Sequence, residues 1–483
     1  MSELSNTSTS LKKKYINTII MLLIIIIFRF IPPVGQITEI GMAVAGVLLG
    51  MIYGWVTIGF GWPSLLALVG LMTTGIYENG TQVIAEGFGA QNAVLFLTIF
   101  LMSAWMEKNG LAMVICNKML SIPFAKGRPW VTVFIFILSC FFVSLLTSSV
   151  SGALIFLGLF KTFCKSAEIK PYEPIAAVLL LGIAISCAIS ELGLPIKGCA
   201  LIYITILNSV TGITVDYLRY TIIMLPFCIV FLLFFVLLSK YILKINADCM
   251  SKVNLSKNDK LQISNWDKAA LISIALFLIA LMLPSFSTNI PGTAFLNKIG
   301  SGGIGLLYLV ICSAVHIDGK PLMEISKIAP AVTWDMWFMC VAFSPVTSAL
   351  TNEQTGISAT LSQLITPLAN NLSPILIVLI FGILACVITQ IANNAVVAMV
   401  FITIVGTISS ALQGINLISL MLVIGCAAHL SCVLPSANMI IGMCYAQKDW
   451  VKKGVLLKYG LISCIVLLLS SIFLVYPVSN IIF

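Results

Sequence analysis

The chain has 483 residues, of which 60% are hydrophobic and only 9% are charged, and its mean hydropathy is +1.11. A soluble domain needs about a quarter of its residues charged to cover its surface. This composition therefore excludes a soluble protein and predicts a polytopic α-helical membrane protein whose main partner is the lipid bilayer. The formal net charge of +9 does not indicate nucleic acid, because no basic cluster is interleaved with aromatic residues in a polar segment.

The chain contains 14 cysteines, which are scattered singly through apolar segments without metal-type spacing or a paired framework. Cysteine in such a setting is typical of a small buried hydrophobic residue. We therefore expect no metal cluster and no covalently bound cofactor.

Residues 1–37 are expected to form a polar tail and the first transmembrane helix. Three lysines precede the apolar run from Tyr15 to Phe28, and no small-residue cleavage site follows, so we interpret the run as a retained helix and not a signal peptide. The first repeat is placed at 38–243. Its expected segments are 38–58, 60–77, 91–107, an interfacial amphipathic stretch at 110–122, a re-entrant hairpin at 129–163, a broken helix at 173–211 and a crossing at 220–243.

A hydrophilic cytoplasmic linker at 244–268 joins this repeat to a second one at 269–483. The second repeat is expected to contain segments at 269–284, 300–315 and 332–350, an amphipathic stretch at 356–368, a hairpin at 373–410, a broken helix at 416–445 and a crossing at 454–476. Three landmark pairs give nearly constant offsets of 242, 245 and 240: Asn92 with Trp334, Ser148 with Asn393, and Pro195 with Pro435. Such spacing indicates an internal duplication.

The distribution of basic residues predicts the topology. With about eleven crossings, two hairpins and a cytoplasmic amino terminus, only Arg29, Arg219 and Lys298 fall outside and Lys197 lies within the membrane. The other 22 of the 26 Lys and Arg residues (26 − 3 − 1) are then cytoplasmic. An odd number of crossings in each repeat inverts one repeat relative to the other. The expected fold is an all-α polytopic cell-membrane protein with two inverted repeats and an extracytoplasmic carboxyl terminus.

Each predicted hairpin consists of apolar arms around a short polar tip. The arms 374–391 and 395–408 are short for a bilayer crossing, which takes about 20 helical residues. Backbone that turns at membrane depth is tolerated only where it is buried in protein or lines a wet cavity. The tips, at 147–149 and 392–394, are therefore candidate binding sites.

The tip side chains are hydroxyls and amides, namely Thr147, Ser148 and Ser149 in the first hairpin and Asn393 and Asn394 in the second. Such groups can donate hydrogen bonds to an oxyanion, and their oxygens can bind a hard cation. The alternative is that the hydroxyls only bond back to their own helix or mediate packing. Two matched tips favour the functional interpretation.

The two broken helices each carry a proline inside an apolar run, at Pro195 and Pro435. Proline removes a backbone hydrogen bond and frees carbonyl groups to face a ligand. Asn438, three residues after the second proline, is expected to face the same cavity. A simple proline kink is the alternative.

Ionisable side chains inside the membrane are costly unless they are paired or hydrated, which makes Glu191 and Lys197 functional candidates. Lys197 is expected to offer a positive charge to an anion or to stand where a mobile cation would bind. Glu191 is a candidate for cation binding, proton transfer or simple neutralisation of Lys197, and a structural ion pair is the alternative. Because the two lie six residues apart, direct contact requires an unwound link. His429 is either a coupling residue near neutral pH or a neutral hydrogen-bonding side chain.

This combination of paired hairpins with polar tips and proline-broken helices resembles the divalent anion/sodium symporter family of the ion transporter superfamily, over residues 15–480. Members of that family carry Ser-Asn-Thr at both tips. The first tip here reads Thr147-Ser148-Ser149 and the second Ala392-Asn393-Asn394, so only Asn393 matches the signature, whereas Pro195, Pro435 and Asn438 fit the broken-helix pattern.

The resemblance implies a homodimeric elevator transporter in which sodium ions bind between each tip and its broken helix, and a di- or tricarboxylate bridges the tips. The substrate residues implied are Ser148, Ser149, Lys197, Asn393, Asn394, Pro435 and Asn438. The coupling residues are Thr147, Ser148, Glu191, Asn393, His429 and Ser436, with sodium expected near Asn393 and Asn438. Lys197 stands where the first cation is expected, so we expect its ammonium to replace one sodium ion.

We therefore expect a secondary transporter of small organic anions, with sodium-coupled symport favoured. Sodium-independent anion exchange and proton-coupled carboxylate transport are the alternatives. A membrane-embedded enzyme is not supported, because the sequence has no metal-ligand spacing and no His/Asp/Ser constellation. A channel would need charged or aromatic filter repeats, which are not evident.

Overall fold

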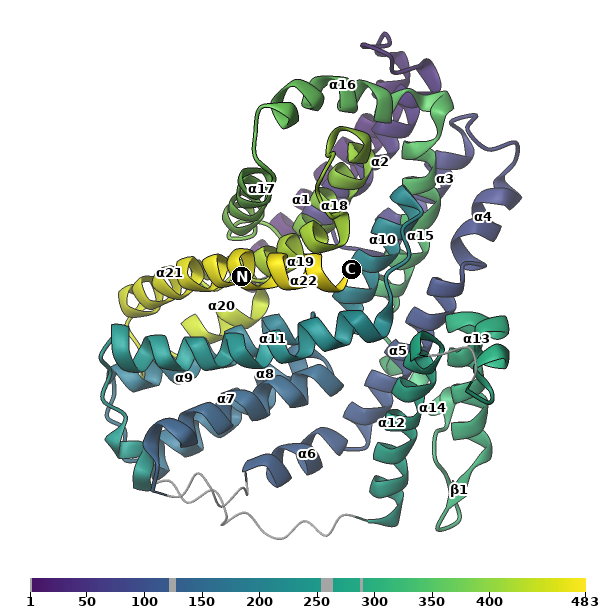
Figure 1. Ribbon diagram of the computed structural model, residues 1–483. Helices are drawn as coiled ribbons and strands as arrows, with labels where there is room; N and C mark the ends of the chain where they lie inside the picture. Colours follow the sequence, from purple (N-terminus) through teal and green to yellow (C-terminus); the bar gives the residue numbers. More distant parts are fainter. Residues whose placement is uncertain (1, 121–126, 253–263, 287–289) are drawn as a thin grey trace.

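The computed structural model describes residues 2–120, 127–252, 264–286 and 290–483, and nearly all of its ordered elements are helical, most of them α-helices (Figure 1). The helices of the first half are α1 (Ser2–Ile27), α2 (Glu39–Thr57), α3 (Gly61–Met72), α4 (Gly80–Phe88), α5 (Gln91–Lys108), α6 (Leu111–Leu120), α7 (Pro129–Leu146), α8 (Ser149–Ser166), α9 (Pro174–Ser190), α10 (Gly198–Thr211) and α11 (Tyr217–Leu237). The expected all-α fold is confirmed.

The second half contains α12 (Asn265–Phe286), α13 (Thr293–Ala314), α14 (Ile325–Ile328), α15 (Trp334–Thr351), α16 (Ile357–Asn370), α17 (Pro374–Ile388), α18 (Asn394–Thr407), α19 (Leu417–Ala428), α20 (Met439–Tyr445), α21 (Lys453–Ser470) and α22 (Tyr476–Ile482). Two short strands, β1 (His316–Ile317) and β2 (Lys320–Pro321), form an antiparallel pair. Part of the linker predicted at 244–268 lies outside the described residues.

Helix α1 begins well before the apolar run that predicted it. Within the described residues, the polar segment from Ser2 to Ser10, expected as a tail, continues the first helix. Once a helix is nucleated, each further residue adds a hydrogen bond at little extra cost. This segment keeps the polar composition of the predicted tail, and its helical conformation was not predicted.

Six helical segments of the described chain are long and apolar enough to cross a bilayer: Glu39–Thr57, Pro129–Leu146, Tyr217–Ile242, Asn265–Ser285, Thr293–Ala314 and Lys453–Ile482. Helices α4 and α5, bent by 46°, form a seventh candidate as a pair. Most of the remaining apolar helices have 10–17 residues, among them both arms of the second hairpin. A multi-pass membrane protein is confirmed, while the number of crossings and their orientation stay predictions.

The order of elements recurs in the two halves. A long helix, an amphipathic helix, a hairpin, a broken helix and another long helix follow one another as α5, α6, α7/α8, α9/α10 and α11, and again as α15, α16, α17/α18, α19/α20 and α21. Helices α5 and α15 both have 18 residues. This recurrence agrees with the predicted duplication, and the inversion of one repeat stays a prediction.

The helices pack into two groups. In the hairpin group, α7 and α8 pack on α9, α17 and α18 pack on α19, and α10 packs on α18. In the frame group, α1 packs on α2, α3 on α15, and α5 on α13. The groups meet principally where α10 packs on α15. Figure 1 shows α7, α8, α9 and α11 running side by side, and α11 also packs on α12.

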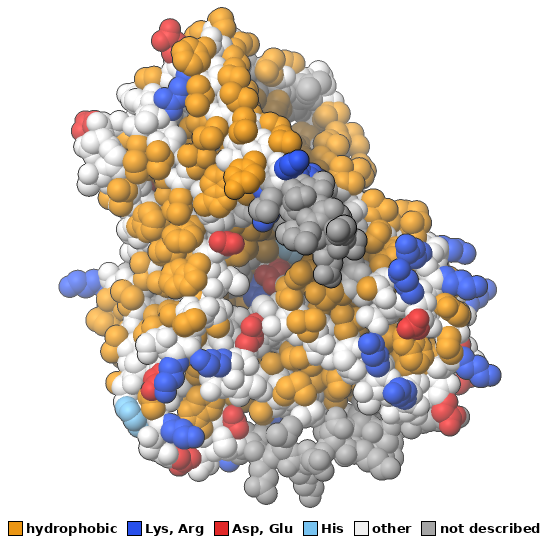
Figure 2. All heavy atoms as spheres, turned by 180° about the vertical axis from the view of Figure 1, so that it is seen from behind, with side chains coloured by type: hydrophobic (Ala, Val, Ile, Leu, Met, Phe, Trp, Pro, Cys, Tyr) orange, Lys and Arg blue, Asp and Glu red, His pale blue; other side chains and the backbone are white. Residues whose placement is uncertain are grey.

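The surface has an apolar part and a charged part. Figure 2 shows hydrophobic side chains over most of the upper half of one face, whereas Lys and Arg gather mainly over the lower half. Many large apolar side chains of α1 and α12 are exposed, for example Ile19 at 56% and Leu276 at 59%. Such exposure is unfavourable in water and favourable in lipid.

Candidate functional site

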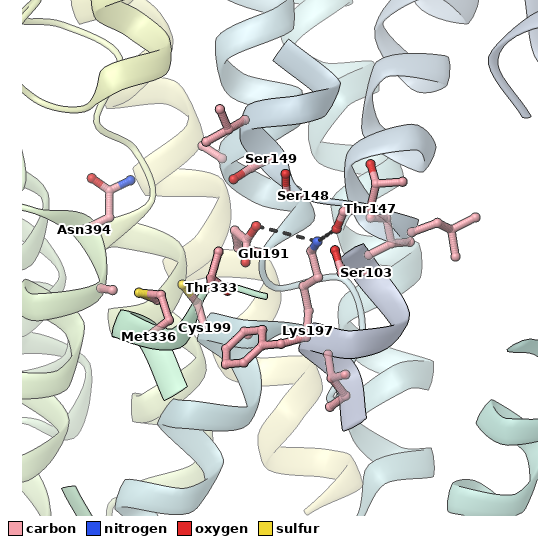
Figure 3. Close-up of a pocket in the computed structure, with 18 of the residues that line it drawn as sticks. Ser103, Thr147, Ser148, Ser149, Glu191, Lys197, Cys199, Thr333, Met336 and Asn394 are labelled. Carbon is pink, nitrogen blue, oxygen red and sulfur yellow. Dashed lines mark hydrogen bonds and ion pairs between the residues drawn. The ribbon is translucent and has the colours of Figure 1, made fainter. Parts of the chain in front are cut away.

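A cavity of about 400 Å³ lies where both hairpin tips and both helix breaks meet. Its size is typical of a small-molecule site. Nine of the eleven residues predicted for the site line it: Thr147, Ser148, Ser149, Glu191, Lys197, Asn393, Asn394, His429 and Asn438. The other two, Pro435 and Ser436, are exposed and lie outside the lining. Figure 3 shows Ser148 and Ser149 on one side of the cavity and Asn394 across from them.

The first hairpin turns at Thr147 and Ser148, because α7 ends at Leu146 and α8 begins at Ser149. The Ser148 Oγ accepts the Ser151 N–H at 3.1 Å, which caps the amino terminus of α8. The Thr147 hydroxyl donates to the Val143 carbonyl at 2.7 Å. Bonding of a tip hydroxyl to its own hairpin helices, the alternative to a binding role, therefore holds for Thr147 and Ser148, although both line the cavity together with Ser149.

The second tip is built from asparagines. The Asn393 Oδ1 accepts the N–H groups of Ala395 at 3.0 Å and Val396 at 3.4 Å, so this side chain caps α18. The Asn394 Oδ1 accepts the Thr389 hydroxyl at 3.1 Å. Both α8 and α18 thus begin at the cavity, and the amino-terminal ends of helices favour anions.

The first helix break brings Lys197 against the first hairpin (Figure 3). Lys197 Nζ lies 3.7 Å from Glu191 Oε1, and it donates hydrogen bonds to the carbonyls of Ser144, at 2.7 Å, and Thr147. The predicted unwound link is present, because α9 ends at Ser190 and α10 begins at Gly198. Lys197 is only 8% exposed. Its ammonium therefore satisfies carbonyls at the end of α7 that have no helical partner, a favourable position for a cation.

The second break carries Asn438 and His429. The Asn438 Oδ1 accepts the Ile441 N–H at 2.9 Å, and its Nδ2 donates to the Ser431 carbonyl at 3.0 Å. His429 is buried, with Nδ1 2.9 Å from the Gly425 carbonyl. Because a carbonyl can only accept, Nδ1 carries a proton. This contact is the one expected of a neutral hydrogen-bonding histidine, and a coupling role for His429 stays a prediction.

Two polar residues just before the second tip fasten this hairpin to the second break. The Gln390 Nε2 donates to the Leu430 carbonyl at 2.8 Å, and its Oε1 accepts the Val433 N–H at 3.2 Å. The Thr389 hydroxyl donates to the Ala428 carbonyl at 2.6 Å. Gln390 thus joins hairpin to break with a neutral amide, as Lys197 does with an ammonium in the first half. The sequence analysis did not assign Thr389 or Gln390 to the site, although polar side chains at the end of an apolar helix were a usable signal.

Replacing Gln390 with leucine is expected to lower the free energy of unfolding by about 1–3 kcal/mol, since the Val433 N–H would lose its partner and the Leu430 carbonyl would lose one of its donors. Thermal unfolding of the purified protein in detergent measures the change. Gln413→Leu is the control, because Gln413 is exposed. Equal stability of the two variants would contradict the proposed fastening.

A third residue missed by the sequence is Glu107, whose Oε1 accepts the Ser148 backbone N–H at 3.1 Å. Glu107 also lines the cavity. The formally charged lining side chains are then Glu107, Glu191 and Lys197, which sum to −1 (−1 − 1 + 1). Because the charge of Lys197 faces Glu191, the cavity does not offer an anion an unbalanced positive charge.

Two helical hairpins and two broken helices around one central cavity are an arrangement typical of a membrane transporter, and whether the hairpins are re-entrant stays a prediction, because α7 is itself long enough to cross a bilayer. A family model described as citrate transporter matches residues 14–427, and the chain belongs to this family. Membership confirms the predicted place in the ion transporter superfamily and makes the chain a secondary transporter of carboxylates. The match ends shortly before the second helix break.

The crystal structure of the Alcanivorax borkumensis YdaH transporter, described as having an unusual topology, is similar in fold. The TM-score is 0.54 at 14% sequence identity, and the alignment covers 82% of this chain and 87% of that one. At this identity the likeness concerns the fold alone. No curated protein matches the chain in sequence.

Proposed function

We propose that the protein carries small di- or tricarboxylates across the cell membrane together with a cation, by an elevator motion of the hairpin group against the frame group. The observation that carries the proposal is that both hairpin tips and both helix breaks line one cavity. A site shared by two pseudo-equivalent halves suits alternating access, because one rigid unit can present it to either side.

The substrate carboxylates are assigned to the two tips. Ser148 and Ser149 lie at the start of α8, and Asn393 and Asn394 at the start of α18. Backbone N–H groups, hydroxyls and amides at helix amino termini bind oxyanions, and a substrate with two carboxylates can engage both helices at once. Asn438 supports this side of the cavity by capping α20.

Cation coupling is assigned differently in the two halves. In the first half, the Lys197 ammonium binds the tip carbonyls and acts as a fixed cation. In the second half, the side chains near Asn393 and Asn438 are neutral amides and hydroxyls, whose oxygens suit sodium as the coupling ion. The lining charge of −1 supports co-binding of a cation, or of a proton at Glu191 or His429, with an anionic substrate.

Sodium-independent exchange is the second candidate. It is favoured by the contacts between each hairpin and its helix break. There the side-chain donors of Lys197 and Gln390 already bind carbonyl oxygens that could otherwise bind a cation. A carrier with filled junctions would need substrate, not sodium, to move. Assembly as a homodimer through the frame group is part of the proposal and is checked by light scattering of the purified protein.

The test is uptake of radiolabelled citrate and succinate into proteoliposomes, with sodium and proton gradients imposed separately. We expect saturable uptake that a sodium gradient accelerates, and trans-acceleration by unlabelled substrate, which distinguishes a carrier from a channel. Uptake that ignores both gradients but requires internal substrate selects exchange. Failure to transport either carboxylate would overturn the proposed substrate class.

A further inference from the structure

The contact between Glu107 and Ser148 joins the two groups of helices. Glu107 lies at the carboxyl end of α5, a frame helix that packs mainly on α13 and α15. Ser148 is the tip residue of the first hairpin and caps α8. The Glu107 Oε1 accepts the Ser148 N–H at 3.1 Å, 41 residues apart in sequence. A frame carboxylate is therefore bound to the moving part of the proposed transporter.

This carboxylate occupies a donor that suits an anionic substrate. Ser148 N–H lies at the start of α8, and both Ser148 and Glu107 line the cavity. A hydrogen bond from a backbone N–H to a carboxylate is charge-assisted and stronger than a neutral one. Glu107 is exposed to solvent, however, so it can be displaced without burying a charge. Its contact with the tip is specific and reversible.

The second tip has no equivalent contact among the described residues. The Asn393 side chain caps α18, and Asn394 pairs with Thr389. Helix α15 corresponds to α5, and the carboxylate that follows it, Glu353, does not line the cavity. The internal carboxylate is thus a property of the first hairpin alone.

We propose that Glu107 is an internal stand-in for a substrate carboxylate, which holds the empty first hairpin against the frame until an incoming carboxylate replaces it at the Ser148 N–H. This inference rests on the proposed function. The replacement exchanges one carboxylate acceptor for another, and the frame loses its hold on the hairpin at the moment when substrate binds. Binding and movement are thereby linked, because the occupied hairpin is free to move and the empty one is held.

The test is the KM and kcat of Glu107→Gln for radiolabelled citrate and succinate in proteoliposomes. Glutamine keeps an acceptor oxygen but loses the charge that strengthens the bond to the Ser148 N–H, so this variant is expected to lower the KM at least threefold and to change kcat by less than twofold. Glu107→Asp keeps the charge but shortens the side chain by one methylene, so it is expected to lower the KM at least twofold. Net uptake without internal substrate is expected to rise in both variants, because the empty hairpin is no longer held.

Glu353→Gln is the matched control and is expected to keep wild-type KM and kcat. If Glu107→Gln only impaired folding, its apparent kcat would fall while its KM stayed at the wild-type value. That result would overturn the inference. An increased KM in Glu107→Gln would show that the carboxylate assists substrate binding, and a wild-type KM in Glu107→Asp would show that contact with the Ser148 N–H does not matter. Either result would also overturn the inference. Lack of transport by the wild-type protein would instead refute the proposed function.

Discussion

Replacement of Lys197 with alanine is expected to reduce carboxylate transport at least tenfold and to make the remaining transport more dependent on sodium. The ammonium binds the Ser144 and Thr147 carbonyls and lies 3.7 Å from Glu191. Removing one partner of a buried ion pair costs about 3–5 kcal/mol, because the other charge stays buried without compensation. Without the fixed cation, a sodium ion becomes the available partner for these oxygens. Initial uptake rates with and without sodium measure both effects.

Two further variants separate the charge of Lys197 from its packing. Lys197→Met keeps most of the side-chain volume and is expected to behave like the alanine variant if the charge is decisive. Combining Lys197→Met with Glu191→Gln removes both charges and is expected to recover much of the lost stability, which a double-mutant cycle quantifies. Lys298→Ala, at an exposed lysine, is the control. Unchanged sodium dependence and substrate affinity in Lys197→Ala would exclude the fixed-cation role.

The architecture was largely predictable because single proline and polar residues interrupt the apolar runs at the turns and breaks of the chain. Proline and polar residues inside apolar runs located both breaks, and short polar tips located both hairpins. The unwound link required for contact between Glu191 and Lys197 is present. These signals depend only on neighbours in sequence. Helix α1 illustrates the opposite case, because the polar composition of its first residues gave no sign that the helix extends back to Ser2.

The site was predictable in its membership but not in its contacts. The tip and break residues converge because each is placed by its own helix end. The contact of Glu107 with Ser148 depends on the tertiary placement of α5 beside the first hairpin. The hydrophobic periodicity of the sequence does not predict such a placement. Likewise, Pro435 and Ser436 belong to the second break, yet the path of the chain turns them to the surface. Sequence position thus indicated which segment reaches the cavity, and packing determined which side chains face it.

The junction that holds Lys197 depends in turn on how closely the two arms of the first hairpin approach each other. Helices α7 and α8 pack together directly below the tip. A Cβ atom added to Gly152 would lie 2.0 Å from Ser144 Oγ and 3.2 Å from Ser144 Cα. Ser144 is also the residue whose carbonyl binds Lys197. Any side chain at position 152 therefore pushes on a ligand of the ammonium.

Gly152→Ala is expected to lower the free energy of unfolding by about 1–3 kcal/mol, the usual cost of overpacking, and Gly152→Val to abolish transport by forcing the arms apart. Gly158→Ala is the matched control, because it lies on the same helix with no atom within 4 Å of its added Cβ. It is expected to stabilise the helix by about 0.5–1 kcal/mol. Thermal unfolding and uptake are measured for all three variants. If Gly152→Ala matched Gly158→Ala in both, close contact of the arms would not be what positions the Ser144 carbonyl, and the fixed-cation geometry would need another support.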